Sequence, residues 1–453
     1  MEKANPFIYG KPVPVDRHVN RNDALRTIFS RIKNKESTAI VGDPQIGKTS
    51  LINYILSETT LNEWLKQESK VLIPVEIDVY AGWLSVEKNP IEFWKFIFST
   101  IESRLEEGGL KDSIKSVKAN QFGSATLVSY FKLLGKSGRR VLLVIDEFDS
   151  LLHHPKFSNA EFFGCLRSIA TNTDGLQLIT SSITTVEEMD EYAYKINPFG
   201  SPFFNNFTNV RLELFDEKSI NELIESSLEP TGINFNNIDR EFVIQVSGHH
   251  PYRLQAACAS LFDGIVTNKD SEQKFVYASD KFLNQTKHHF ELIWRRLDDK
   301  SRTVLVIMTT LRLGGLIFGK DYSFGEIEKS TIFEPELQRL SRLGLVEKVG
   351  KKSLIQWDSE NLLVWRDQKW RIACEGIVWW LTESIVGESR DIPNYEQWLH
   401  DHEVLGYLLT RKQWENIKTI AKKLPTKLGG GISLIFIEFI KGLLKKSNLS
   451  PKK

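Results

Sequence analysis

Short apolar runs and longer amphipathic segments alternate along the first half of the chain. In the longer segments apolar residues recur every three or four positions, which is the period of a helix with one buried face. The shorter runs are rich in Val, Ile and Leu, and they lie at residues 37–41, 71–79, 139–145, 175–182 and 209–214. Near-continuous apolar strands that alternate with helices are typical of a parallel sheet covered on both faces. The sequence therefore predicts an α/β fold here.

The second half of the chain has a helical pattern. Gly248 and Pro251 interrupt it, because glycine ends a helix readily and proline favours the first turn of the next one. Further on, a first helix at 303–308, a third helix at 336–345 and a hairpin wing at 346–355 follow the order of a winged helix. The second half is therefore expected to contain a helical region followed by a winged-helix domain.

These patterns divide the 453 residues into several parts, as expected for a chain of this length. The predicted parts are an extended arm at 1–20, an α/β core at 21–215, a helical lid at 216–300, a winged-helix domain at 301–388 and a small helical module at 389–453. The arm is rich in Pro and Gly. It leads into the first helix of the core, so it can wrap a ligand bound to the core or run as a strap along the sheet.

Composition and charge exclude several classes of protein. A net charge of +1 argues against nucleic-acid binding by the whole chain, although it permits a local basic face. No uncharged run approaches the roughly 18 residues that a membrane-spanning helix needs, and residues 1–7 lack the apolar core of a signal peptide. The three cysteines lack the spacing of a metal site and are expected to be reduced core residues. We therefore expect a cytoplasmic protein.

A glycine-rich loop follows the first predicted strand and precedes a helical pattern. Its two glycines permit backbone angles that side chains forbid, so the loop N–H groups can converge on an anion at the helix N-terminus. Lys48 can reach the β- and γ-phosphates, and the Thr49 hydroxyl can bind Mg²⁺. The predicted phosphate-binding residues are Gly42, Asp43, Pro44, Gln45, Ile46, Gly47, Lys48, Thr49 and Ser50.

Two adjacent carboxylates end the third predicted strand. Asp146 at the strand tip is expected to hold Mg²⁺ together with Thr49, and Glu147 is expected to orient and deprotonate the attacking water. Glu147 and Lys48 are therefore the predicted catalytic residues. Asp149 is expected to cap the helix that follows.

Hydroxyl groups lie at the tip of the fourth predicted strand. In a parallel sheet this tip lies beside the phosphate loop, so Ser181 or Ser182 can sense the γ-phosphate. Either residue can instead cap the next turn, and the sequence leaves the two interpretations open. The adjacent His249 and His250 are not accompanied by a cluster of carboxylates, and we assign them no metal.

Basic residues lie on the predicted third helix and wing, and they are Arg339, Arg342, Lys348, Lys351 and Lys352. They can contact DNA phosphates, or they can form a solvated face and wing tip.

The C-terminal module is predicted to contain helices at 394–409 and 412–424, followed by a glycine hinge and a last helix at 432–446. Glu438, Lys441 and Lys445 form one stripe of the last helix, and its other faces are apolar. This helix can dock on the protein's own core, form a seam between copies of the chain, or lie on a membrane surface.

The loop at 42–49 and the strand at 141–147 resemble the Walker A and Walker B motifs of a P-loop ATPase, from the branch with an additional catalytic glutamate. Residues 18–25 resemble the entry motif of AAA-like and STAND (signal-transducing) ATPases, with Asn20 where that motif has Gly. Residues 248–252 are similar to the lid motif Gly-x-Pro of this class. Pro251 matches its proline, and His249 stands at a glycine position.

The resemblance implies that Val19 and Arg21 contact the nucleotide and that Pro251 couples the nucleotide to the lid. It implies a switch in which ADP holds the lid and winged helix closed, and exchange for ATP exposes a surface for self-association. Related bacterial proteins work in signalling or in defence against phages, through an effector or sensor partner. Related AAA+ ATPases use an arginine finger, for which Arg167 is the candidate.

We therefore expect a slowly hydrolysing ATPase of the STAND type that binds ATP or ADP with Mg²⁺ and forms homo-oligomers in the ATP state. Two alternatives stay open. One is an AAA+ ATPase that binds or remodels DNA through the winged helix, and the other is a scaffold that holds ADP without hydrolysing ATP.

Overall fold

The computed structural model describes residues 4–19, 21–83, 85, 88–106, 108–196, 203–267, 272–318, 333–349, 356–357, 363–364, 369–388 and 433–449. The chain divides into two compact units. Pro12–Glu213 forms the sheet unit, whereas Met1–Lys11 and Leu214–Lys453 together form the helical unit.

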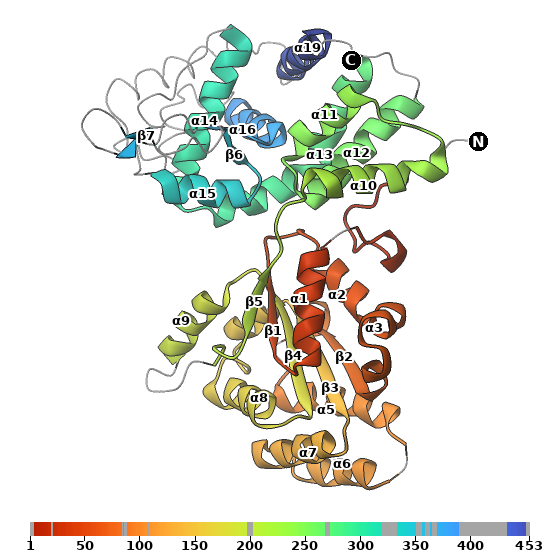
Figure 1. Ribbon diagram of the computed structural model, residues 1–453. Coiled ribbons are helices and arrows are strands. Elements are labelled where there is room, and N and C mark those ends of the chain that lie inside the picture. Colours follow the sequence, from red (N-terminus) through yellow and green to blue (C-terminus); the bar gives the residue numbers. More distant parts are fainter. Residues whose placement is uncertain are drawn as a thin grey trace. The chain divides into compact units, whose positions relative to one another are not determined.

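The sheet unit is built on five parallel strands in the order β2-β3-β4-β1-β5 (Figure 1). The strands are β1 (Thr38–Val41), β2 (Leu72–Asp78), β3 (Arg140–Asp146), β4 (Leu176–Ser182) and β5 (Thr208–Arg211). Every residue of β1, β3 and β4 is buried. The α/β fold with a parallel sheet is therefore confirmed, and burial on both faces explains why these strands are apolar without alternation.

Helices cover both faces of this sheet (Figure 1). They are α1 (Asn22–Lys33), α2 (Lys48–Leu56), α3 (Glu58–Leu65), α4 (Val79–Gly82), α5 (Pro90–Arg104), α6 (Gly109–Ala119), α7 (Ser124–Lys136), α8 (Ala160–Asn172) and α9 (Val186–Ile196), with short 3₁₀ helices η1 (Val15–Arg17), η2 (Lys66–Val71) and η3 (Phe148–His153). Aromatic residues of α5 pack with α7, where the ring of Phe98 lies 4.9 Å from that of Tyr130. The apolar period of α1 is confirmed, because Leu25, Ile28 and Phe29 are all buried.

Most of the helical unit follows β5 in the sequence. Its elements are α10 (Glu217–Leu228), η4 (Glu229–Thr231), α11 (Asn237–Ser247), α12 (Pro251–Val266), α13 (Gln273–Arg296), α14 (Asp299–Phe318), α15 (Glu334–Arg342), β6 (Val346–Val349), β7 (Gln356–Trp357), β8 (Leu363–Val364), β9 (Lys369–Ile372), α16 (Glu375–Glu388) and α19 (Ser433–Leu449). The break predicted between α11 and α12 is confirmed. Gly248 ends α11 with φ +62°, and Pro251 occupies the first turn of α12.

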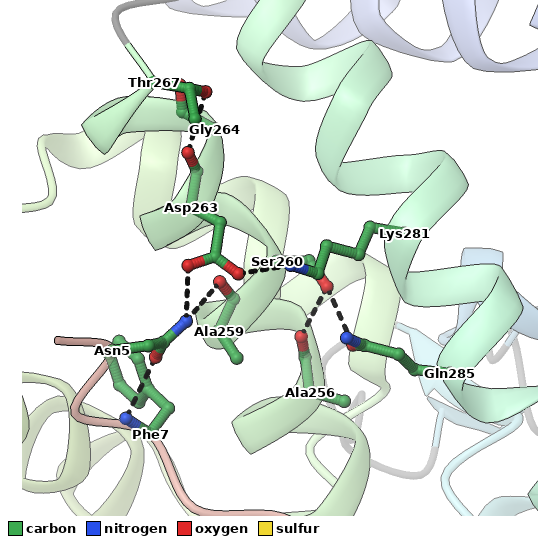
Figure 2. Close-up of polar contacts among 10 residues, drawn as sticks. All are labelled: Asn5, Phe7, Ala256, Ala259, Ser260, Asp263, Gly264, Thr267, Lys281 and Gln285. Atoms are coloured by element: carbon green, nitrogen blue, oxygen red, sulfur yellow. Dashed lines mark hydrogen bonds and ion pairs between the residues drawn. The ribbon is translucent and has the colours of Figure 1, made fainter. Parts of the chain in front are cut away.

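The N-terminal arm contacts α12 of the helical unit (Figure 2). The Nδ2 of Asn5 donates to the carbonyl oxygen of Ala259 and to Oδ1 of Asp263, each at 2.9 Å. Lys281 forms an ion pair with the other oxygen of Asp263, at 2.5 Å. The ring of Phe7 is buried and lies 5.9 Å from that of Phe235. Residues 5–9 therefore belong to the helical unit.

A close backbone contact joins the α11–α12 corner to the turn after α15. A Cβ atom on Gly248 would lie 2.0 Å from the carbonyl oxygen of Gly344, so glycine is required there. Beside this contact, the fully buried Arg253 donates from Nη2 to the carbonyl oxygen of Leu343 at 2.6 Å. Buried charges need such partners, so Arg253 stabilises the end of α15 as well as α12.

One strand of the second half has a partner that the sequence did not reveal. The strand β6 pairs antiparallel with β9, with Val346 opposite Ile372, and residues 350–355 of the predicted hairpin lie outside the described residues. The sequence shows that β6 is a strand, but not which distant strand completes its hydrogen bonds. Lys351 and Lys352 lie outside the described residues, and the winged helix stays a prediction.

The last helix, for which three environments were predicted as alternatives, packs within the helical unit. Five apolar side chains of α19 are buried, those of Ile435, Phe436, Phe439, Ile440 and Leu443. The ring of Phe436 lies 4.8 Å from that of Trp379, and the ring of Phe439 lies 6.3 Å from that of Phe242. Docking on the protein's own core is therefore the observed outcome, and the seam between copies and the membrane surface are wrong for this face. The helices predicted at 394–409 and 412–424 lie outside the described residues.

The three cysteines are free and buried, as predicted from their spacing. None of the helices in the described part of the chain is long and apolar enough to cross a membrane.

Candidate functional site

The glycine-rich loop connects β1 to α2 at the carboxyl edge of the sheet. Gly47 adopts φ +103° at the N-terminus of α2, and Gln45 adopts φ +60°. A Cβ atom on Gly42 would lie 2.7 Å from Cγ2 of Ile46 and 3.3 Å from Cβ of Leu212. Close packing therefore requires glycine at position 42, and the positive φ favours glycine at position 47. Both are expected for a phosphate loop.

Lys48 is buried within this loop, with 5% of its surface exposed. Its Nζ donates to the carbonyl oxygens of Gly42 at 2.9 Å and Asp43 at 3.2 Å. Burial lowers the pKa of Lys48, and the nearby carboxylates of Glu147 and Asp146 oppose this shift. The ammonium group is thus held at the centre of the loop, where it can meet a phosphate.

Thr49 and Asp146 bring the two predicted motifs together. The Thr49 hydroxyl donates to Oδ2 of Asp146 at 2.7 Å, although the two residues are 97 positions apart in the sequence. Asp146 is buried at the end of β3, opposite Asp78 of β2. A hydroxyl and a carboxylate oxygen side by side are the hard ligands that Mg²⁺ prefers, so this pair fits the predicted metal site.

Glu147 follows directly in a left-handed conformation with φ +53°, at the N-terminus of η3. Its backbone N–H donates to Oδ1 of Asp146 at 3.0 Å. A left-handed conformation costs energy for a residue other than glycine, and it turns this side chain out of the register of β3. The Glu147 charge acts on the Lys48 ammonium, so the predicted base lies at the same edge of the sheet as the loop.

The tip of β4 lies beside the phosphate loop, as its predicted place in a parallel sheet requires. Val41 is opposite Ser182, and the N–H of Gly42 donates to the carbonyl oxygen of Ser182 at 3.2 Å. The Ser182 hydroxyl donates to the carbonyl oxygen of Thr184 and so closes the turn. The Ser181 hydroxyl is buried and has no hydrogen-bond partner among the described residues. Ser182 therefore matches the capping interpretation, and γ-phosphate sensing by Ser181 stays a prediction.

The entry segment contacts the loop through Arg21, the N-cap residue of α1. Arg21, at φ +87°, donates to the carbonyl oxygen of Ile46 at 2.9 Å and to that of Glu213. Val19 is half-buried, and residue 20 lies outside the described residues. Ser50, the last residue predicted for the loop, accepts a hydrogen bond from the N–H of Val13 at 3.1 Å. Arg21 thus supports the loop backbone, and nucleotide contact by Val19 and Arg21 stays a prediction.

Two further predicted residues lie on helices α12 and α8. Pro251 belongs to the helical unit, where it begins α12. His249, at the glycine position of the lid motif, adopts φ +64°, which is the conformation that glycine favours. Arg167 lies on α8, where its charge acts on the carboxyl of Asp190. Their predicted roles in lid coupling and as an arginine finger stay predictions.

Three features of the site were missed in the sequence. His18 stacks on Tyr54 of α2 at 4.3 Å, and burial, with the charge of Arg21, lowers the pKa of His18 to about 4. The pKa of Glu76 is raised, mainly by partial burial and to a smaller extent by the charges of Asp146 and Asp78. The histidine at the first position of the entry motif and the acidic residues alternating along β2 were the available signals.

The third missed feature is the role of Asp149. Its Oδ2 accepts hydrogen bonds from the N–H groups of Ile183 and Thr184 and from the Thr184 hydroxyl, at 2.8 to 3.1 Å. It therefore binds the turn after β4, and the prediction that it caps the following helix is wrong. Glu147 occupies the N-cap position of that helix.

Together these features define a class of protein. A glycine-rich loop leads from β1 into α2, and a carboxylate at the end of β3 meets the threonine of the loop. The sheet has β4 between these two strands. This is the fold and the site of a P-loop NTPase.

Within this class, the chain belongs to the Novel STAND NTPase 2 family (nSTAND2), whose sequence model matches residues 35–312. No curated protein matches the chain. A Walker-type ATPase of Pyrococcus abyssi has a similar fold, with 13% identity, a TM-score of 0.51, and coverage of 83% of this chain and 99% of that one. The ORC2 protein of Aeropyrum pernix, solved with ADPNP and ADP, is 13% identical with a TM-score of 0.43, covering 84% and 98%. Such low identity shows the fold alone.

Proposed function

We propose that this protein is an ATP-binding and slowly hydrolysing molecular switch of the STAND type. The observation that carries the proposal is the hydrogen bond between Thr49 and Asp146, with Lys48 and Glu147 beside it. This arrangement supplies a phosphate cradle, a pair of metal ligands and a carboxylate base at one edge of the sheet. The match to an NTPase family supports the same class of reaction.

Each residue has a defined role in the proposed reaction. The loop amides and Lys48 bind the β- and γ-phosphates, and Lys48 exchanges its bonds to Gly42 and Asp43 for phosphate oxygens. Thr49 and Asp146 would hold Mg²⁺, which neutralises charge on the phosphates when it is bound. Glu147 accepts a proton from water as the water oxygen attacks the γ-phosphorus. The bond to the bridging oxygen breaks, and ADP and phosphate are released.

The test of hydrolysis is the variant Glu147→Gln, which keeps the shape of the side chain and removes the base. We expect phosphate release to fall at least about 100-fold while binding of ATP persists. Asp174→Asn is a suitable control, because Asp174 is an exposed residue paired with Lys35. Phosphate release by Glu147→Gln at the rate of the unchanged protein would show that Glu147 is not the base.

The switch itself requires that the nucleotide changes the assembly of the protein. We propose that ADP holds the lid and the winged helix closed, that ATP opens them through Pro251, and that the open form self-associates for signalling or defence. The measurement is the molar mass of Glu147→Gln in solution with ADP and with ATP. A larger assembly with ATP is expected, and equal masses in both nucleotides would contradict the switch.

The alternative function, DNA binding through the winged helix, has less support. Two of the basic residues on which it depends are engaged within the chain. Arg339 forms an ion pair with Asp298 at 2.6 Å, and Lys348 lies 3.2 Å from a carboxylate oxygen of Glu334. Phosphate contact would have to displace these partners. The second alternative, a scaffold that holds ADP permanently, would be supported if ADP copurifies and no turnover is detected.

A further inference from the structure

Asp149 connects the turn that contains Glu147 to the turn after β4. One carboxylate oxygen accepts from the backbone N–H of Ile183 at 3.1 Å, from the backbone N–H of Thr184 at 3.0 Å and from the Thr184 hydroxyl at 2.8 Å. Asp149 lies only two positions after Glu147, in the short helix that begins there. A carboxylate that accepts three hydrogen bonds from one turn fixes the position of that turn.

The turn held by Asp149 is also connected to the phosphate loop. The Ser182 hydroxyl donates to the carbonyl oxygen of Thr184, and the carbonyl oxygen of Ser182 accepts from the N–H of Gly42. A continuous series of hydrogen bonds therefore runs from Asp149 through the turn at 182–184 to the first glycine of the loop. Such a series restrains the distance between Glu147 and the β4 tip, which ends beside the phosphate loop.

We propose that Asp149 is a positioning residue for ATP hydrolysis, which aligns Glu147 and the β4 tip on the same γ-phosphate. The inference rests on the proposed ATPase function. Asp149 need not touch the nucleotide, because it acts through the turn at 182–184 and through its own helix. A displacement of about 1 Å in a catalytic group can cost about 100-fold in rate, so the effect of losing Asp149 falls on turnover.

The proposed alignment predicts that a change of Asp149 affects kcat and leaves the Kd for ADP nearly unchanged. The hydrogen bonds of Lys48 run to Gly42 and Asp43, and that of Thr49 runs to Asp146. None of these bonds involves Asp149, so we expect the affinity for nucleotide to be largely preserved when Asp149 is changed. We expect Asp149→Ala to lower kcat about 10- to 100-fold, while the Kd for ADP changes less than about 2-fold. A residue that merely stabilised the fold would lower the active fraction and the binding stoichiometry together, and it would leave kcat per active site unchanged.

Conservative variants separate positioning from general stability. Asp149→Asn keeps an oxygen that can accept from the same turn, so it is expected to restore most of the lost kcat. Thr184→Val removes the hydroxyl donor but keeps the backbone N–H, so its loss in kcat is expected to be smaller than that of Asp149→Ala. Because the two side chains share one hydrogen bond, the double variant is expected to lose less than the sum of the single losses, expressed as free energies.

The experiment compares the unchanged protein, Glu147→Gln, Asp149→Ala, Asp149→Asn, Thr184→Val, the double variant and the surface control Asp174→Ala. Steady-state phosphate release gives kcat and KM, and titration with ADP gives Kd. Turnover in the unchanged protein that Glu147→Gln abolishes establishes the proposed function separately. Turnover by Asp149→Ala within about 2-fold of the unchanged protein, with Thr184→Val also unchanged, would overturn the proposal.

A second measurement decides the question if the unchanged protein shows no turnover. Amide hydrogen exchange at Ile183 and Thr184 reports whether the turn is held. With a non-hydrolysable ATP analogue bound, these amides and the peptide containing Glu147 are expected to be protected in the unchanged protein and to lose that protection together in Asp149→Ala. Independent behaviour of the two peptides would contradict the alignment, whether or not the protein hydrolyses ATP.

Discussion

The sheet unit and the helical unit differ in how far apart in the sequence their contacting segments lie. The sheet unit is one continuous segment, Pro12–Glu213, and its site lies on two motifs that can be recognised in the sequence. The helical unit combines the first residues with the second half of the chain, and Asn5 reaches Asp263 across 258 positions. Motifs therefore reveal the chemistry of one unit, whereas long-range packing decides the construction of the other.

The largest expected effect tests whether the arm is an integral part of the helical unit. Phe7 is 6% exposed and packs against Phe235 and Phe262, so Phe7→Ala would leave a cavity. We expect a loss of about 3 kcal/mol in the free energy of unfolding of the helical unit. Hydrogen exchange of α12 peptides in denaturant measures it, and Lys11→Ala, in the exposed part of the arm, is the control. Unchanged protection of α12 would mean that the arm is not part of this unit.

The next largest effect concerns nucleotide binding by the sheet unit. Lys48→Ala removes the buried ammonium at the centre of the phosphate loop. Charge-assisted hydrogen bonds to phosphate are lost, so ADP is expected to bind about 100-fold more weakly, or about 2.7 kcal/mol. Calorimetric titration measures the affinity, with the exposed Lys35→Ala as the matched control. Equal affinities would contradict the assignment of the loop.

A smaller effect concerns the response of the sheet unit to acid. The pKa of His18 is lowered to about 4 in the folded protein, against 6.5 for an unperturbed histidine. Between these values the unfolded chain binds more protons than the folded one, so stability falls as the pH drops from 6.5 to 4. Discounting for partial exposure, we expect His18 to contribute on the order of 1–2 kcal/mol of this loss.

The measurement for His18 is unfolding of the sheet unit at several pH values, followed by hydrogen exchange in denaturant. His18→Asn lacks a group that titrates in this range, so its stability is expected to depend less steeply on pH. An unchanged slope in His18→Asn would show that other groups cause the acid response.

The smallest expected effect lies on the surface of the helical unit. The ion pair of Arg339 with Asp298 is largely exposed, and such pairs contribute about 0–1 kcal/mol. Arg339→Ala is therefore expected to change stability by less than about 1 kcal/mol. If the winged helix bound DNA, the same variant would weaken duplex binding and reduce its dependence on salt. We expect no duplex binding at low salt by either protein, and a salt-dependent complex lost in the variant would favour the DNA-binding alternative.

Much of the sheet unit was predictable because its signals are local. The five strands were found within a few residues of their observed bounds, since strands buried on both faces are continuous apolar runs. The loop at 42–49 and the pair Asp146–Glu147 were recognised from residue type and spacing, and the structure brings them together. The sequence could not show that Asp149 binds the turn after β4, because a carboxylate near a helix start also fits a local cap.

In the helical unit the same reasoning found the elements but not their partners. The pattern of β6 identified a strand, while its pairing with β9 depends on a distant segment. The pattern of α19 identified an apolar face, and only packing against Trp379 and Phe242 shows that the chain itself covers it. The sequence shows a histidine where the lid motif has glycine. Only the structure shows that His249 has a positive φ, which is the backbone conformation that glycine favours.

The sequence by itself determined the α/β fold, the phosphate loop and the carboxylates that define an NTPase of the STAND class. These depend on periodicity and on residue types at fixed spacing, which are properties of short segments. The tertiary structure alone decided where the arm lies, what covers α19, and which turn Asp149 holds. The sequence shows that an apolar face or a carboxylate needs a partner. The packing of segments far apart in the chain decides which partner it has.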